Sequence, residues 1–181
     1  YPLQSTQLFS FLKLMGSLQL EMLFRDGKEH FYHKSLIALL EHNYFSQSKA
    51  AAALTETLLK GNIVYLTAHS QLIPRGVQRE ELLEAILKKC ATTEQLCDWF
   101  CGVAALIEGD LQSDEKSLLY AVYQFVNRLK GLNLPLSTDL WIKIFVRELG
   151  QISVPFSGEP LAGLQIMGPL ETRVLDFDNV I

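Results

Sequence analysis

The last nineteen residues, G-L-Q-I-M-G-P-L-E-T-R-V-L-D-F-D-N-V-I (163–181), decide how we interpret the rest of the chain. Residues 164–167 predict a strand, a polar turn follows, and Leu-Asp-Phe at 175–177 leads to the start of a second strand at 180–181. The chain then ends on that strand's second apolar residue, and it begins with Tyr1 rather than an initiator methionine. We therefore expect a fragment of a larger protein.

The composition is that of an ordinary globular domain. The chain has 181 residues, of which 49% are hydrophobic and 20% charged, enough for one core with a small appendage. No apolar run reaches the roughly 18 residues that a membrane span needs. The net charge of −4 is unlike that of a dedicated nucleic-acid module, so any DNA contact must be local or shared with other parts.

The three cysteines do not form a disulfide framework. An odd, low count fits a reducing, cytoplasmic setting. Cys97 and Cys101 are four residues apart and share a helix face, but no histidine lies near them. We expect buried apolar side chains there and no metal site.

Helical periodicity dominates residues 1–150 and predicts about seven helices. One begins near Ser5-Thr6 and is weakened or kinked at Gly16. Gly61-Asn62 ends another, and residues 63–66 form the one clear strand of this region. After the first helix, the predicted helices cover 31–45, 46–60 (the one that Gly61-Asn62 ends), 77–89, 92–108, 113–130 and 137–149.

Local end signals support several of these helices. Thr92 and Gln95 have the spacing of a capping box. Ser137-Thr138 opens the last helix and Gly150 closes it. The predicted fold class is therefore mainly α with a small β element at the C-terminal end. Residues 1–150 form a helical domain and residues 151–181 a strand–turn–strand piece.

The common catalytic motifs are absent from the sequence. We find no phosphate-binding loop, dinucleotide fingerprint, nucleophile elbow or zinc-binding H-E-x-x-H motif. His30 and His33 could meet on one helix face, but we interpret them, with His42, as surface or hydrogen-bonded histidines. We predict no catalytic residue, no metal and no cofactor, and the chain does not look like a complete enzyme.

Residues 164–181 resemble motif V of UvrD-type superfamily 1 helicases, which lies in the second RecA-like domain. The resemblance rests on Leu164-Gln165-Ile166-Met167, Arg173, Leu175-Asp176-Phe177 and Val180, and covers about a tenth of the chain. Tyr32-His33 with residues 36–42 also resembles the helical insertion before motif V in AddB- and RecC-like subunits of helicase–nuclease complexes. The resemblance thus implies a helical insertion joined to the edge of a RecA-like domain.

Three departures from the motif imply that the motor function is lost. Gly168 stands where active helicases usually have threonine, Leu170 where they have histidine, and Val174 where they have glycine. Leucine cannot hydrogen-bond a phosphate, and valine adds bulk where backbone must come close to its ligand. Gly168, Leu175, Asp176 and Phe177 would then keep a structural role.

The family resemblance also implies partners. AddB- and RecC-like proteins are inactivated helicase folds that accompany an active helicase and guide DNA strands, and the AddB type carries a C-terminal PD-(D/E)XK nuclease domain. Thr172 and Arg173 are the residues that we expect to face DNA or a neighbouring subunit. A salt bridge from Arg173 to Glu171 or Asp176 that shapes the turn is the alternative.

Three functions remain open at this point. The first is a non-catalytic part that guides DNA and acts as a scaffold in a helicase–nuclease of DNA recombination and repair, with no membrane role. The second is a helical protein–protein interaction domain without a DNA role. The third is part of a divergent helicase or nuclease that is still active, so enzyme activity of the larger protein is uncertain.

Overall fold

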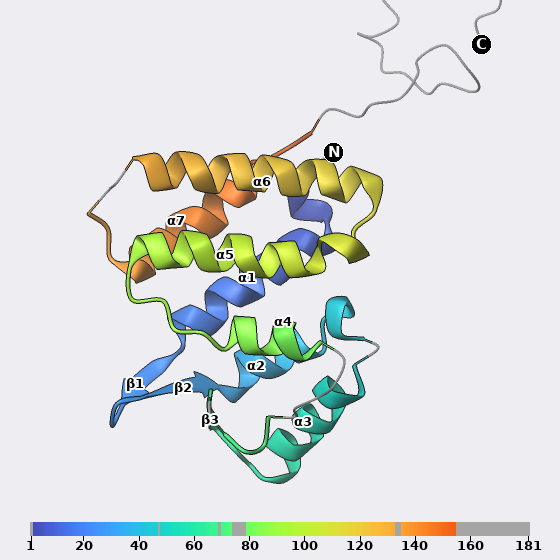
Figure 1. Ribbon diagram of the computed structural model, residues 1–181, viewed down its shortest axis with the longest axis vertical. Coiled ribbons are helices and arrows are strands. Elements are labelled where there is room, and N and C mark those ends of the chain that lie inside the picture. Colours follow the sequence, from blue (N-terminus) through green and yellow to red (C-terminus); the bar gives the residue numbers. More distant parts are fainter. Residues whose placement is uncertain (1, 47, 69, 74–78, 133–134, 155–181) are drawn as a thin grey trace, which may run out of the picture.

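The structure is a computed structural model in which residues 2–46, 48–68, 70–73, 79–132 and 135–154 are described. These residues form seven α-helices and a small three-stranded antiparallel sheet (Figure 1). The predicted mainly helical class is confirmed. The sheet lies in the N-terminal half, whereas the predicted strands at 164–167 and 180–181 lie outside the described residues.

The elements follow one another along the chain in a simple order. The helices are α1 (Gln7–Leu20), α2 (His33–Leu40), α3 (Lys49–Lys60), α4 (Glu80–Ile86), α5 (Thr93–Ile107), α6 (Ser113–Gly131) and α7 (Thr138–Leu149). The strands are β1 (Leu23–Arg25), β2 (Lys28–Tyr32) and β3 (Tyr65–Thr67), paired in the order β1-β2-β3. Short 3-10 turns cover Leu3–Ser5, Asn43–Phe45 and Glu108–Asp110.

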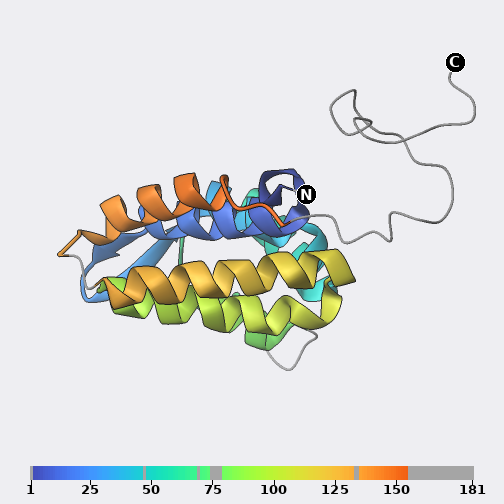
Figure 2. The same ribbon diagram turned by 90° about the horizontal axis from the view of Figure 1, so that it is seen from above.

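Four of the longer helices pack in two layers of two. Figure 2 shows α1 beside α7 in one layer and α5 beside α6 in the other, while Figure 1 places α2, α3, α4 and the sheet at one end. The side chains of Phe11, Met15 and Leu18 on α1 are fully buried. Phe145 of α7 lies 4.3 Å from the Phe100 ring of α5, measured between ring centroids. Aromatic packing therefore joins the two layers.

Gly16, where the sequence predicted a weakened or kinked helix, does not interrupt the first helix. α1 runs without interruption from Gln7 to Leu20, and Gly16 is buried in its middle. A Cβ at Gly16 would lie 3.1 Å from Cγ2 of Ile142 and 3.2 Å from Cγ2 of Val146. The glycine lets α7 approach α1 closely, which offsets its low helix propensity.

A β-hairpin covers residues 23–32 and overlaps the start of the helix that the sequence predicted from residue 31. Asp26 and Gly27 both have positive φ, 52° and 73°, between the paired residues Arg25 and Lys28. This is the backbone of a two-residue type I′ hairpin turn, for which Asp-Gly is a preferred sequence. The predicted helix over 31–45 is thus shorter, because residues 31 and 32 belong to β2 and α2 covers only His33–Leu40.

The predicted ends of α5 and α7 are confirmed to within one residue, whereas α4 ends at Ile86 and not at residue 89. The Thr92 side chain accepts a hydrogen bond from the Gln95 backbone at 3.2 Å, but Gln95 Oε1 accepts from Ala91 N and not from Thr92 N. Ser137 Oγ accepts from Leu140 N at 3.3 Å, and Gly150 is the C-terminal cap of α7. These helix ends could be predicted from the sequence because each cap acts on backbone groups within one turn of the helix.

The two ends of the helical domain lie side by side. Pro2 and Ser153 form an antiparallel β-bridge, and Leu3 N donates to Ile152 O at 2.9 Å. Leu3 is fully buried beneath this pairing. The first and last described segments of the chain therefore meet at one place.

Candidate functional site

The site residues that the sequence predicted cannot be placed. Thr172, Arg173, Gly168, Leu175, Asp176 and Phe177 all lie outside the described residues, as do the departures at Leu170 and Val174. The structure therefore contributes candidate sites that sequence reasoning did not find. They are a polar pocket, a lysine-centred ion-pair network, an apolar groove and one face of the sheet.

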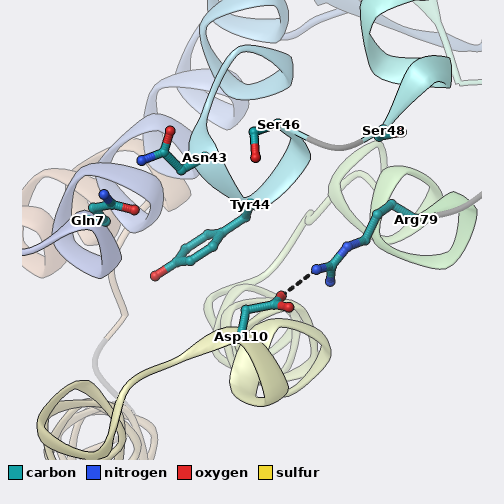
Figure 3. A pocket seen from close by; sticks show the side chains of 7 residues that line it. All are labelled: Gln7, Asn43, Tyr44, Ser46, Ser48, Arg79 and Asp110. Carbon is teal, nitrogen blue, oxygen red and sulfur yellow. Dashed lines mark hydrogen bonds and ion pairs between the residues drawn. The ribbon is translucent and has the colours of Figure 1, made fainter.

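The polar pocket has a volume of about 280 Å³ and is built from segments far apart in the chain (Figure 3). The guanidinium Nη2 of Arg79 lies 2.6 Å from Oδ2 of Asp110, so this ion pair connects the start of α4 to the 3-10 turn that follows α5. Arg79 has a left-handed backbone, with φ of 69°. The lining side chains are Gln7, Asn43, Tyr44, Ser46, Ser48, Arg79 and Asp110. They can hold a small polar molecule by hydrogen bonds.

Tyr44 forms one wall of this pocket. Its ring packs edge-on against Phe11, with 5.1 Å between centroids, and its buried hydroxyl has no hydrogen-bond partner among the described residues. Burial raises the pKa of Tyr44, and the charges of Glu115 and Asp110 raise it further. The hydroxyl therefore stays protonated at neutral pH and is a donor rather than a base.

His42 lies behind Tyr44 in a defined hydrogen-bond chain. Its Nε2 lies 2.8 Å from Ser10 Oγ, which donates to Gln7 O, and its Nδ1 accepts from Tyr44 N at 3.4 Å. This arrangement assigns the ring proton to Nε2. Burial lowers the pKa of His42, so the ring is neutral at physiological pH. The predicted hydrogen-bonded role of this histidine is confirmed.

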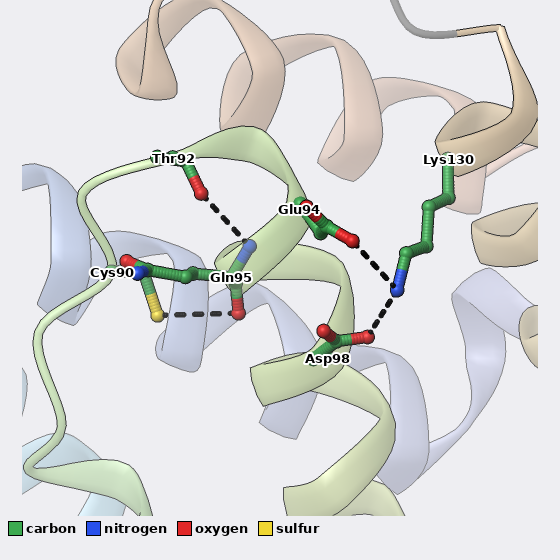
Figure 4. A network of polar contacts seen from close by, with 6 residues as sticks. All are labelled: Cys90, Thr92, Glu94, Gln95, Asp98 and Lys130. Carbon is green, nitrogen blue, oxygen red and sulfur yellow. Dashed lines mark hydrogen bonds and ion pairs between the residues drawn. The ribbon is translucent and has the colours of Figure 1, made fainter.

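The ion-pair network joins α5 to α6 (Figure 4). Lys130 Nζ lies 2.7 Å from Asp98 Oδ1 and 3.5 Å from Glu94 Oε1. The hydrogen bond that Lys130 donates to Asp98 is the main reason that the pKa of Lys130 is raised. Glu94 is in the first turn of α5 and Lys130 in the last turn of α6, so each charge also complements its helix dipole. This network has a structural role.

The cysteines are not reactive in this fold. Cys90 and Cys97 are buried, and Cys101 is half-buried. Burial raises the pKa of Cys90 to about 12 and that of Cys97 to about 11, so both thiols are protonated at neutral pH. Within the described part of the chain, no three histidine, cysteine or acidic side chains could hold a metal ion together.

An apolar groove of about 520 Å³ runs between α2 and α3. Leu40, Phe45 and Leu59 line its apolar part, and the Leu59 side chain is 56% exposed. Glu56 and Lys60 pair with each other along its border. An apolar strip with charged borders is the kind of surface that an amphipathic helix binds.

One face of the sheet carries aromatic and basic side chains. Tyr32 is directly opposite Tyr65, and the ring centroids are 5.6 Å apart. His33 packs edge-on against Tyr32 at 4.8 Å, and its Nδ1 lies 3.1 Å from the carbonyl oxygen of Val64. Neighbours in the register place Leu23, Arg25, Lys28, His30 and Thr67 on the same face. We call this surface the outer face; Phe31 and Leu66 are buried on the other side.

Comparisons with protein-family models, curated proteins and solved structures found no match for this chain. Among the described helices, none is both long enough and apolar enough to cross a membrane.

Proposed function

We propose that this chain is a non-catalytic, DNA-guiding and scaffolding part of an inactivated helicase-like subunit of a helicase–nuclease in DNA recombination or repair. The helical domain would be an insertion, and residues 151–181 would lead into the edge of the second RecA-like domain. DNA and an active helicase subunit would be the partners, in the reducing cytoplasm. The motif-V-like ending with Gly168, Leu170 and Val174 is the basis of this proposal in the sequence.

The observation that carries the proposal is the pairing of the domain's two ends. An insertion interrupts another domain, so its first and last residues must lie close together. The Pro2–Ser153 bridge and the 2.9 Å hydrogen bond from Leu3 to Ile152 meet this requirement. The described residues on either side of this pairing therefore lie together, as the two ends of an insertion must.

Binding of forked DNA by the full chain, measured by gel shift over a salt series, tests the proposal. We expect salt-sensitive binding, because phosphate contacts release counterions. Arg173→Glu should weaken it, and Arg128→Glu, which reverses an exposed charge on α6, should not. Absence of binding, or binding that salt does not affect, would overturn the proposal. Equal binding by both variants would instead favour the salt bridge of Arg173 to Glu171 or Asp176.

A second assay separates the proposal from an active motor. We expect no DNA-stimulated ATP hydrolysis by the chain or by a longer protein that contains it. ATP hydrolysis that Asp176→Ala abolishes would replace the proposal with a divergent active helicase.

The groove between α2 and α3 favours a second candidate function, a protein-interaction domain. Its exposed Leu59 would then contact an amphipathic helix of the partner. Leu59→Glu should abolish co-purification with an active helicase subunit while DNA binding is unchanged. Loss of both activities would instead indicate that the substitution damages the fold.

A further inference from the structure

The outer face of the sheet combines stacking groups and cations in one small area. Its residues form three cross-strand rows, namely Tyr32 with Tyr65, His30 with Leu23 and Thr67, and Lys28 with Arg25. Tyr65 is 38% exposed and Leu23 is 50% exposed, so the face is open to solvent. Because Lys28 is four residues from Tyr32 along β2, the face is about 13 Å long.

The charged side chains of the outer face are all basic, although the whole chain has a net negative charge. None of the described residues in its three rows is a carboxylate. The nearest acidic side chain along the hairpin is Asp26, whose Oδ2 lies 3.6 Å from Arg25 Nε at the exposed turn. Such exposed pairs contribute little, and Arg25 can still contact another anion. Glu29 points to the opposite face, where it lines a pocket with Lys88 and Lys89.

The hairpin that carries this face is held in position. Phe24, on the opposite face, lies under the Lys89 ammonium of the α4–α5 connection, with 3.2 Å from Nζ to the ring centroid. Phe31 and Leu66 anchor β2 and β3 in the core. The tyrosine pair is thus presented on a supported surface, which lowers the entropy lost on binding.

We propose that the outer face binds single-stranded DNA, with bases stacked on Tyr32 and Tyr65 and phosphates against Lys28 and Arg25. Aromatic rings stack with any unpaired base, whereas the bases of a duplex already stack on each other. The combination of rings and cations distinguishes this surface from the groove between α2 and α3, whose exposed side chain is aliphatic. This inference rests on the proposed function and deepens it, because it names where in the helical domain a guided strand would lie.

The test measures the fluorescence anisotropy of a fluorescein-labelled oligodeoxythymidylate titrated with the full chain. We expect Tyr65→Ala and Tyr32→Ala each to weaken binding about fivefold or more, and Lys28→Glu to weaken it and lower its salt dependence. The matched controls are Tyr120→Ala and Lys143→Glu, which make the same changes at exposed positions of α6 and α7. These controls should bind like the wild type.

Conservative variants keep the test decisive if an alanine variant does not fold. Tyr65→Phe retains the ring and should retain binding, whereas Tyr65→Leu retains an apolar side chain and should not. Far-UV circular dichroism identifies the folded variants. If Tyr65→Phe and Tyr65→Leu both bind DNA as tightly as the wild type, the inference is overturned and the proposed function still stands. Absence of any DNA binding by the wild type would overturn both.

Two further probes check the assignment of the ligand. A duplex of the same length should bind more weakly than the single strand, because its bases cannot stack on the tyrosines. Tighter binding of oligouridylate than of oligodeoxythymidylate would assign the face to RNA and overturn the DNA assignment.

Discussion

At the scale of single residues, Gln19 joins two distant parts of the core. Its side chain is 7% exposed; Nε2 donates to Lys88 O at 2.6 Å and Oε1 accepts from Cys90 N at 3.4 Å. The side-chain amide of Gln19, on α1, thus pairs with one backbone carbonyl and one backbone N–H of the α4–α5 connection. The segment needs this side chain because it has no regular secondary structure of its own.

Replacing Gln19 with methionine should destabilise the fold by about 1–3 kcal/mol, because one buried and one partly buried backbone group lose their partners. Urea unfolding measures this change. Gln124→Met, an exposed position on α6, is the matched control and should stay within about 0.5 kcal/mol of wild type. Equal effects of the two substitutions would show that the Gln19 hydrogen bonds contribute nothing.

His42 should make the fold sensitive to acid. Its pKa is lowered in the folded state by burial. Protons therefore favour the unfolded chain, and the stabilisation is present above the unfolded pKa of about 6.5 and is lost as pH falls through the folded pKa.

His42→Gln should reduce the loss of unfolding free energy between about pH 7 and pH 5, measured by urea titration at each pH. Identical pH dependence of wild type and His42→Gln would contradict this account.

At the scale of elements, two glycines in helices have opposite surroundings. Gly16 of α1 is packed against Ile142 and Val146 of α7, whereas a Cβ at Gly102 of α5 would have no atom within 4 Å. A side chain added at the first position meets neighbours, and one added at the second meets only solvent. The same residue type is required in one helix and dispensable in the other.

Gly16→Leu should therefore destabilise the domain by about 1–3 kcal/mol through overpacking. Gly102→Ala should stabilise it by up to about 1 kcal/mol through helix propensity. Thermal unfolding of the two variants and wild type gives both changes. A stable Gly16→Leu variant would mean that α1 and α7 are not in close contact.

The elements also show what sequence reasoning could and could not reach. The ends of α5 and α7 were predictable, because Thr92, Ser137 and Gly150 act on backbone within one helical turn. The hairpin was missed, although Asp26-Gly27 between two short runs is a hairpin signal. Its second strand pairs with residues 65–67, and a pairing across that distance leaves no local pattern.

The candidate sites could not be predicted either, because they too depend on contacts between distant parts of the chain. The Arg79–Asp110 ion pair joins residues that are 31 positions apart, and the Gln19–Cys90 contact joins residues 71 apart. The outer face depends on the register of three strands, which only the fold sets. The predicted site at Thr172 and Arg173 stays a prediction, since it lies outside the described residues.

At the scale of the whole molecule, the described residues form one packed unit whose ends meet. Buried core residues run from Leu3 to Leu149 without a division into separate clusters. We expect residues 2–154, expressed alone, to unfold in one cooperative transition in a thermal melt. A gradual change in the helical signal would show that these residues are not an independent insertion.

The measurement that tests the central claim most directly is the salt dependence of the affinity of the full chain for forked DNA. The proposed phosphate contacts of Arg25, Lys28 and Arg173 predict that log affinity falls with log salt concentration with a slope of about −2. A slope near zero, or no binding at low salt, would contradict a DNA-guiding role and favour the protein-interaction domain.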